Sequence, residues 1–239
     1  MNDTKAVDQP DGKSDTTRGV VRWLLQIGVF TLILMASLFI SSGRLDWVMA
    51  WIYVGLFVAS QALTAFILIP SNPELLAKRA ESKGPRDLDR VLAGLVALFG
   101  PVSIWVVAGL DMRFGWRPQI PLALQLVALA IAALGSLLTI WAMASNKFFY
   151  GVAHIADDHA VATVGPYRYV RHPGYAGGIL FDLATPLALG SWWTFIPALL
   201  TVCFIVARAI LEDRTLQEEL DGYEEYAQRT RYRLLPGIW

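Results

Sequence analysis

Four long blocks without a charged residue dominate the first 144 residues and restrict what this chain can fold into. Each block is long enough, or nearly so, to cross a hydrocarbon core that needs about 20 apolar residues. Too little polar sequence remains to cover four such helices in water. The sequence therefore predicts an all-α, polytopic membrane helical bundle. The blocks are residues 23–40, 47–69, 91–110 and 120–144.

The composition agrees with a membrane protein and argues against several other classes. Only 17% of the residues are charged, whereas soluble domains average about 25%. The net charge is zero, so bulk charge gives no reason to expect a nucleic-acid partner. Cys203 is the single cysteine, which excludes an intrachain disulfide and a cysteine-rich metal site. The three histidines lack metal-ligand spacing with carboxylates, so we predict no metal.

Two shorter apolar runs follow, residues 175–189 and 192–207, with the turn signal Gly190-Ser191 between them. A helix of this length rises about 25 Å, so the pair is expected to form a tight hairpin that barely crosses the core. Together with the four blocks, it gives five to six transmembrane segments. An amphipathic cytosolic helix is predicted over residues 215–226.

Three regions are expected along the chain. Residues 1–19 are polar and rich in aspartate, which predicts a disordered tail. Residues 20–144 form a four-helix transmembrane region. Residues 145–239 hold a polar loop, whose motif is described below, the membrane hairpin and the C-terminal helix. We expect the cofactor-binding and catalytic residues in this region.

The basic residues predict the orientation in the membrane. If every apolar run crosses, 17 of the 20 Lys and Arg residues fall on one side, and only Arg44, Arg113 and Arg117 fall on the other. Loops rich in Lys and Arg stay in the cytoplasm. We therefore expect a multi-pass protein of the inner or plasma membrane with both termini cytoplasmic.

The most informative polar segment is residues 165–175, GPYRYVRHPGY, which we call the motif. Its two prolines lack N–H donors and disfavour helix in the preceding residue, which predicts extended or turning backbone. Tyr167 and Tyr175 can offer ring faces to a cation, and His172 can donate and accept hydrogen bonds. These features favour a cofactor site at the membrane surface. The alternative is a basic loop that contacts anionic lipid head groups.

A second constellation lies where the last apolar run ends, at residues 208–213, RAILED. Arg208 and Glu212 are four residues apart and share one face of a helix. Glu212 and Asp213 place two like charges near the membrane, which is costly without cationic partners. Such a pair suits an ammonium group or ribose hydroxyls, although a surface ion pair is the alternative. Asp182 is a further acid inside an apolar run, and its partner cannot be read from the sequence.

Together these features resemble the isoprenylcysteine carboxyl methyltransferase-like membrane enzymes, over about residues 145–239. The resemblance implies a cytosol-facing S-adenosylmethionine pocket and a lipophilic substrate that enters from the bilayer. It also implies that Arg208 faces the substrate and acts in catalysis. The residues that it implies for cofactor binding are His159, Ala160, Val161, Ala162, Tyr167, His172, Pro173, Gly174, Tyr175, Glu212 and Asp213.

The resemblance therefore predicts a methyltransferase that acts on a membrane-embedded acceptor, with carboxylate O-methylation favoured. A carboxylate is ionised at pH 7 and needs no base, whereas an amine would have to lose a proton to Glu212, Asp213 or Asp182. One alternative is an NADPH-dependent reductase of an isoprenoid or sterol. Another is a non-catalytic membrane scaffold or transporter. Apart from the substrate, membrane lipids are the expected partners, and the oligomeric state cannot be predicted.

Overall fold

A computed structural model describes residues 12–81, 87–116, 118–149 and 159–239 of the chain. All regular structure within these ranges is helical and no strand occurs in them, so the predicted all-α class is confirmed. The helices are α1 (Gly12–Ser42), α2 (Val48–Ser71), α3 (Pro73–Glu81), α4 (Asp87–Gly94), the π-helical turn η1 (Leu95–Phe99), α5 (Gly100–Phe114), α6 (Leu122–Ser145), the 3-10 turn η2 (Gly165–Arg168), α7 (Pro173–Ala188), α8 (Phe195–Glu219) and α9 (Tyr223–Arg229).

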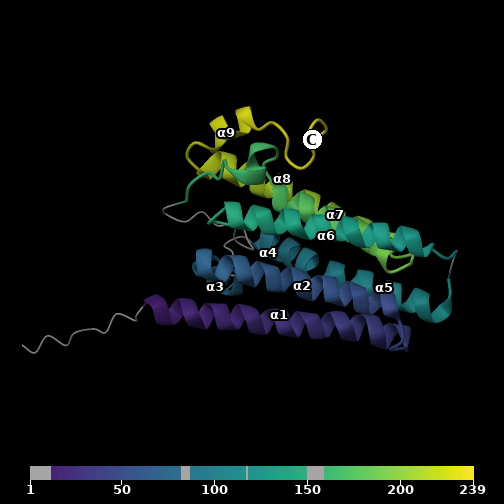
Figure 1. Cartoon of the computed structure of the whole chain (residues 1–239). Helices are drawn as coiled ribbons and strands as arrows, with labels where there is room; N and C mark the ends of the chain where they lie inside the picture. Colours follow the sequence, from purple (N-terminus) through teal and green to yellow (C-terminus); the bar gives the residue numbers. More distant parts are fainter. Residues whose placement is uncertain (1–11, 82–86, 117, 150–158) are drawn as a thin grey trace, which may run out of the picture.

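The chain runs along the bundle six times, so α8 ends at the same end of the bundle where α1 begins (Figure 1). The short helices α3 and α9 lie at this end. Five helices are long and apolar enough to cross a membrane, whereas α7 has only 16 residues. The prediction of five to six transmembrane segments is confirmed. The five candidate spans are Asp15–Ser42, Val48–Ser71, Leu88–Phe114, Leu122–Ser145 and Phe195–Glu219.

The predicted hairpin is formed by α7 and α8, and small residues fix it against α6. Gly135 of α6 lies so close to α7 that an added Cβ would meet the carbonyl oxygen of Gly177 at 2.6 Å. At the far end Gly190 has a φ of +77°, a conformation that glycine adopts without strain. Close helix packing through small residues is typical of membrane bundles. Here the close packing of α6 on α7 holds the motif, at the start of α7, against the end of α6.

The third span is interrupted at η1, beside α8. Gly100, directly after this turn, faces Thr201 of α8, whose Oγ1 would lie 2.5 Å from an added Cβ. π-Helical turns are rare and frequently occur at functional sites. The close approach at Gly100 brings α4, which precedes the turn, beside the carboxyl-terminal half of α8.

Two predicted boundaries were wrong. α1 begins at Gly12, so residues 12–19 are helical, and only residues 1–11 of the predicted tail lie outside the described residues. Gly19 packs directly on Ala77 of α3, which explains why the helix continues beyond the membrane block. The predicted helix over residues 215–226 is divided between α8 and α9, because Gly222 has a φ of +79°.

Candidate functional site

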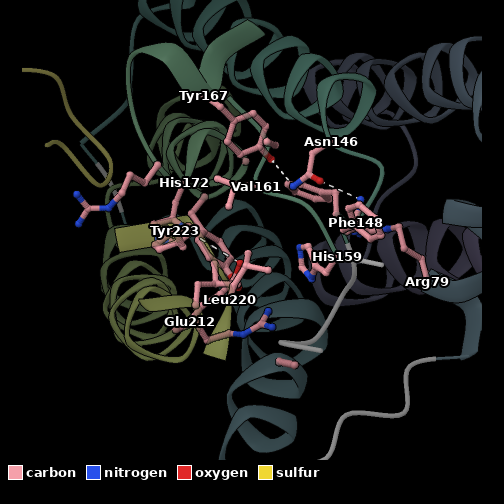
Figure 2. A pocket seen from close by; sticks show the side chains of 18 of the residues that line it. Arg79, Asn146, Phe148, His159, Val161, Tyr167, His172, Glu212, Leu220 and Tyr223 are labelled. Atoms are coloured by element: carbon pink, nitrogen blue, oxygen red, sulfur yellow. Dashed lines mark hydrogen bonds and ion pairs between the residues drawn. The ribbon is translucent and has the colours of Figure 1, made fainter. Parts of the chain in front are cut away.

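A cavity of about 540 Å³ opens at the end of the bundle that carries α3 and α9 (Figure 2). Its wall combines residues from α3, α4, η1, α7, α8 and α9 with the segment between α6 and α7. This volume lies within the 300–1,000 Å³ that is usual for small-molecule sites. Nine of the twelve predicted site residues line it: His159, Val161, Ala162, Tyr167, His172, Gly174, Tyr175, Arg208 and Glu212.

The other three predicted residues, Ala160, Pro173 and Asp213, are not part of the lining. Pro173 instead occupies the first turn of α7, where a missing N–H costs nothing. Asp182 lies elsewhere, on a separate small cavity between α1, α2, α5 and α7. Its position gives no support to a role as base for an amine acceptor.

The glycines and prolines of the motif give its backbone the turning path expected from the sequence. Gly165 has a φ of +59° and begins the 3-10 turn η2, and His172 precedes the first helical residue of α7. The backbone between them is irregular, as predicted. This path buries Arg171 and His172 at the base of the cavity.

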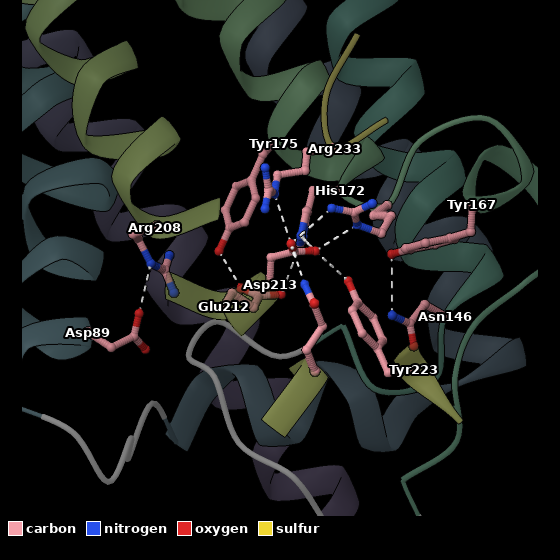
Figure 3. A network of polar contacts seen from close by, with 12 residues as sticks. Asp89, Asn146, Tyr167, His172, Tyr175, Arg208, Glu212, Asp213, Tyr223 and Arg233 are labelled. Carbon is pink, nitrogen blue, oxygen red and sulfur yellow. Dashed lines mark hydrogen bonds and ion pairs between the residues drawn. The ribbon is translucent and has the colours of Figure 1, made fainter. Parts of the chain in front are cut away.

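Asp213 is the centre of a buried polar network (Figure 3). Its side chain is 0% exposed, and Arg171 binds both carboxylate oxygens, at 2.7 and 2.9 Å. Such bidentate pairs are strong and directional. Asp213 therefore joins α8 to the motif, to α9 and to residue 233. The remaining donors are His172 Nε2 at 3.2 Å, Arg233 Nε at 2.8 Å, the Tyr223 hydroxyl at 3.0 Å and Gln217 Nε2 at 2.9 Å.

Glu212, the neighbouring acid, faces the cavity. Its side chain is 28% exposed, and the Tyr175 hydroxyl donates a hydrogen bond to Oε2 at 2.6 Å. His172 Nδ1 lies 4.0 Å from the other oxygen. Because only one of these contacts is a short hydrogen bond, the carboxylate retains acceptor capacity toward a ligand.

Arg208 lies one turn before Glu212 on α8, as predicted from their spacing. Its Nε donates to Asp89 Oδ1 of α4 at 3.1 Å, and its guanidinium lies over the Tyr175 ring, 5.7 Å from the centroid. The pair with Asp89 is mostly buried, with side chains 8% and 11% exposed. Tyr175 thus contacts both charged residues that α8 contributes to the cavity wall.

Two further arginines of the cavity wall, Arg79 of α3 and Arg90 of α4, were not predicted. Arg79 Nη1 donates to the carbonyl of Phe149 at 3.0 Å, and burial lowers its pKa. For Arg90 the only signal in the sequence was a charged cluster before the third apolar block, DLDR at residues 87–90, which also contains Asp89. Such clusters are common in loops, so the pattern alone does not indicate a site.

Aromatic rings form another part of the wall. His159 stacks on Phe148, with 4.5 Å between the ring centroids. The Tyr226 hydroxyl donates to the carbonyl of Tyr167 at 2.8 Å. Burial raises the pKa of Tyr226 to about 12 and raises the pKa values of Tyr167 and Tyr223 as well. These phenols are neutral at physiological pH and act as hydrogen-bonding groups.

Comparison with known proteins points to one family. The family described as phospholipid methyltransferase matches residues 120–221. The protein-S-isoprenylcysteine O-methyltransferase of Schizosaccharomyces pombe is 34% identical over 110 residues, which cover 44% of this chain and 47% of that protein. Probable protein-S-isoprenylcysteine O-methyltransferases of Oryza sativa, subspecies indica and japonica, are 31% identical over 78 residues, 32% of this chain and 41% of each relative.

The chain spans about half the length of the curated relatives it matches. The family match extends from the start of α6 beyond the end of α8, so it contains the motif, the hairpin, Arg208 and the acidic pair. The resemblance predicted from these residues is confirmed. Residues 120–221 thus resemble the phospholipid methyltransferase family, and a stretch of 110 residues is similar to a protein-S-isoprenylcysteine O-methyltransferase.

Proposed function

We propose that this chain is an S-adenosylmethionine-dependent methyltransferase that methylates a lipophilic acceptor, with a carboxylate oxygen as the favoured target. The observation that carries the proposal is the arrangement of Arg208, Tyr175 and Glu212 in one cavity. A cation and an anion lie one helical turn apart, with one tyrosine in contact with both. A site that joins a cationic donor to an anionic acceptor needs such a pair.

The Glu212 side of the cavity suits the cofactor. S-adenosylmethionine, when bound, would supply a methyl group on a positively charged sulfur: transfer would form the oxygen–methyl bond, break the sulfur–methyl bond and leave the sulfur as the neutral thioether of S-adenosylhomocysteine. The Glu212 carboxylate would accept hydrogen bonds from the ammonium group or the ribose hydroxyls. The rings of Phe148, Tyr167 and Tyr223 add faces that attract cations. The donor set therefore fits a ligand that is cationic and aromatic.

The Arg208 side of the cavity suits an anionic acceptor with an apolar body. Arg79 and Arg90 also line the cavity, and an arginine can hold a carboxylate through two parallel hydrogen bonds. The wall from α4 and η1 carries small and apolar residues, which suit a lipid chain. Gly94 faces open space, since an added Cβ would meet no atom within 4 Å. The apolar wall residues are Ala93, Gly94, Val96 and Ala97.

The residues of the chain would act mainly by positioning. A carboxylate acceptor is already ionised at pH 7, so no side chain has to remove a proton. Arg208 would hold the acceptor oxygens, and Glu212, one turn further along α8, would hold the donor. Fixing two reactants in this way can contribute about 7–11 kcal/mol to catalysis. The surrounding aromatic residues would exclude water from the reacting atoms.

The distribution of basic residues supports a cytoplasmic position for the cavity, because among the Lys and Arg residues of the described ranges only Arg44 and Arg113 belong to segments at the opposite end of the bundle. A cytoplasmic cavity has access to a soluble cofactor. Its wall from α4 and η1 belongs to a candidate span. The acceptor would therefore reach the site from the bilayer.

Calorimetric titration of the detergent-purified protein with S-adenosylhomocysteine, with NADPH in parallel, tests the proposal. Saturable micromolar binding of the homocysteine product alone is the expected result. Binding of NADPH alone would favour the reductase alternative. Binding of neither would favour the non-catalytic scaffold or transporter.

A further inference from the structure

Residues 230–239, here called the strap, are fixed to the motif by backbone hydrogen bonds. The N–H groups of Arg171 and His172 donate to the carbonyls of Tyr232 and Arg233, both at 2.9 Å. Arg171 Nη1 also donates to the carbonyls of the first two strap residues, at 3.0 and 2.9 Å. The strap therefore holds the backbone on which His172 is presented to the cavity.

The second half of the strap lies along the membrane hairpin. Leu234 is buried against Ala176 of α7 and Ala209 of α8, and Ile179 and Trp239 pack on the same cluster. Ala176 and Ile179 are four and seven residues beyond His172, so they lie roughly 6 and 10 Å further along α7. In Figure 1 the end of the chain accordingly lies beside α7 and α8. The strap thus extends from the cavity toward the level of the hydrocarbon.

The exposed side chains of this half are apolar. Leu235 is 51% exposed and Ile238 is 78% exposed, and residues 234–239 contain no charged side chain. The last charge before them, Arg233, binds Asp213 and lies over the Trp239 ring, 5.2 Å from the centroid. Exposed apolar side chains between a cation and an aromatic ring that contact each other fit an interfacial anchor, because aromatic and basic side chains gather at membrane interfaces. Leu234 and Trp239 pack on residues of α7 and of the candidate span α8, so the occupant that fits the exposed apolar side chains beside them is lipid.

We propose that residues 234–239 insert into the bilayer interface and that this insertion keeps the motif in its binding geometry. The bilayer then acts as part of the site, because it holds the strap, and the strap holds the backbone of Arg171 and His172. Cofactor affinity will depend on this anchor. The affinity part of the inference rests on the proposed function, whereas the insertion part does not.

Fluorescence of a labelled cysteine tests insertion. Replacing the single native cysteine (Cys203→Ser) allows the environment-sensitive dye NBD to be attached in Ile238→Cys, with Glu224→Cys on the exposed face of α9 as the matched control. In nanodiscs of phosphatidylcholine and phosphatidylglycerol, the dye at residue 238 should emit at shorter wavelength. Doxyl-labelled lipid should quench it several-fold more than the dye at residue 224. Equal, water-like emission and equal quenching at both sites would overturn the proposal.

Polar substitution of the exposed strap residues tests the coupling. The double variant Leu235→Asp with Ile238→Asp adds charges only where side chains are exposed, so it should still fold. Apparent affinity falls in proportion to the fraction of molecules with a competent site. If nine in ten straps detach, S-adenosylhomocysteine will bind about tenfold more weakly in nanodiscs.

The control variant, Leu235→Ile with Ile238→Leu, keeps the apolar area and should bind like the wild type. Unchanged affinity in the aspartate variant would refute the coupling even if the dye shows insertion. If the wild type itself fails to bind S-adenosylhomocysteine, the proposed function fails, and the dye experiment still decides whether the strap inserts.

Discussion

The hydroxyl of Tyr175 donates a 2.6 Å hydrogen bond to Glu212, and the ring of the same tyrosine lies beneath the guanidinium of Arg208. One residue of the motif therefore orients both charged residues that α8 presents to the cavity. This contact connects the proposed cofactor side of the site to the proposed acceptor side.

Replacing Glu212 by Gln should weaken S-adenosylhomocysteine binding by roughly 10- to 100-fold, because hydrogen bonds to a charged group contribute about 1.5–3 kcal/mol. The protein should still fold, since this side chain is partly exposed. Calorimetric titration measures the affinity. The control is Glu218→Gln, an exposed acid on the same helix, which should bind normally. Equal affinities in the two variants would show that Glu212 does not contact the cofactor.

Arg208→Ala should leave cofactor binding intact and lower kcat/KM by about 100-fold, the size of effect expected when a reacting group is misplaced by 1 Å. The variant is best combined with Asp89→Asn, because Arg208→Ala alone would leave a buried carboxylate without its ion pair. Methyl-transfer kinetics and cofactor titration are measured on the same preparation. Loss of cofactor binding along with turnover would mean that Arg208 has a structural role.

Asp213→Asn should destabilise the protein by about 3–5 kcal/mol, since it leaves the buried guanidinium of Arg171 without its anion. The melting temperature in detergent, followed by circular dichroism, should fall markedly. Asp221→Asn, which changes an exposed acid between α8 and α9, should leave it unchanged. A small shift in Asp213→Asn would show that water or another acid replaces the lost charge.

Stability should fall as the pH rises above about 10, the pKa of tyrosine in an unfolded chain. Tyr167, Tyr223 and Tyr226 have raised pKa values in the fold. The unfolded state therefore loses protons that the folded state keeps, and the stability present below pH 10 is lost above it. Melting temperatures from pH 8 to 11 test this. The slope should become shallower in Tyr226→Phe and stay the same in Tyr232→Phe, which changes an exposed tyrosine.

The spans and the hairpin could be predicted because an uncharged block of this length has few stable arrangements other than a helix that crosses the membrane. The placement of Arg208 and Glu212 on one face of α8, where both line the cavity, also followed from helical spacing alone. The different roles of Glu212 and Asp213 did not, because neighbouring acids look equivalent in a sequence. On a helix they are about 100° apart, so one faces the cavity and the other faces the motif arginine.

Asp89 could not be assigned from the sequence, because it is 119 residues from its partner Arg208. Only the approach of the third span to α8, made possible by Gly100, brings them together. The end of α8 was also misplaced, since the left-handed conformation of Gly222 divides the predicted helix. Tertiary contacts decide these features, and a hydropathy pattern does not contain them.

The most direct test is transfer of a labelled methyl group from S-adenosylmethionine to a membrane-soluble carboxylate, such as an S-isoprenylated cysteine, by the purified protein in nanodiscs. We predict a lipid-soluble product whose label is released as methanol by alkali, as a methyl ester requires. The Arg208→Ala and Asp89→Asn double variant should make little of it. Absence of labelled product, in a preparation that retains its fold, would contradict the proposed activity on a carboxylate.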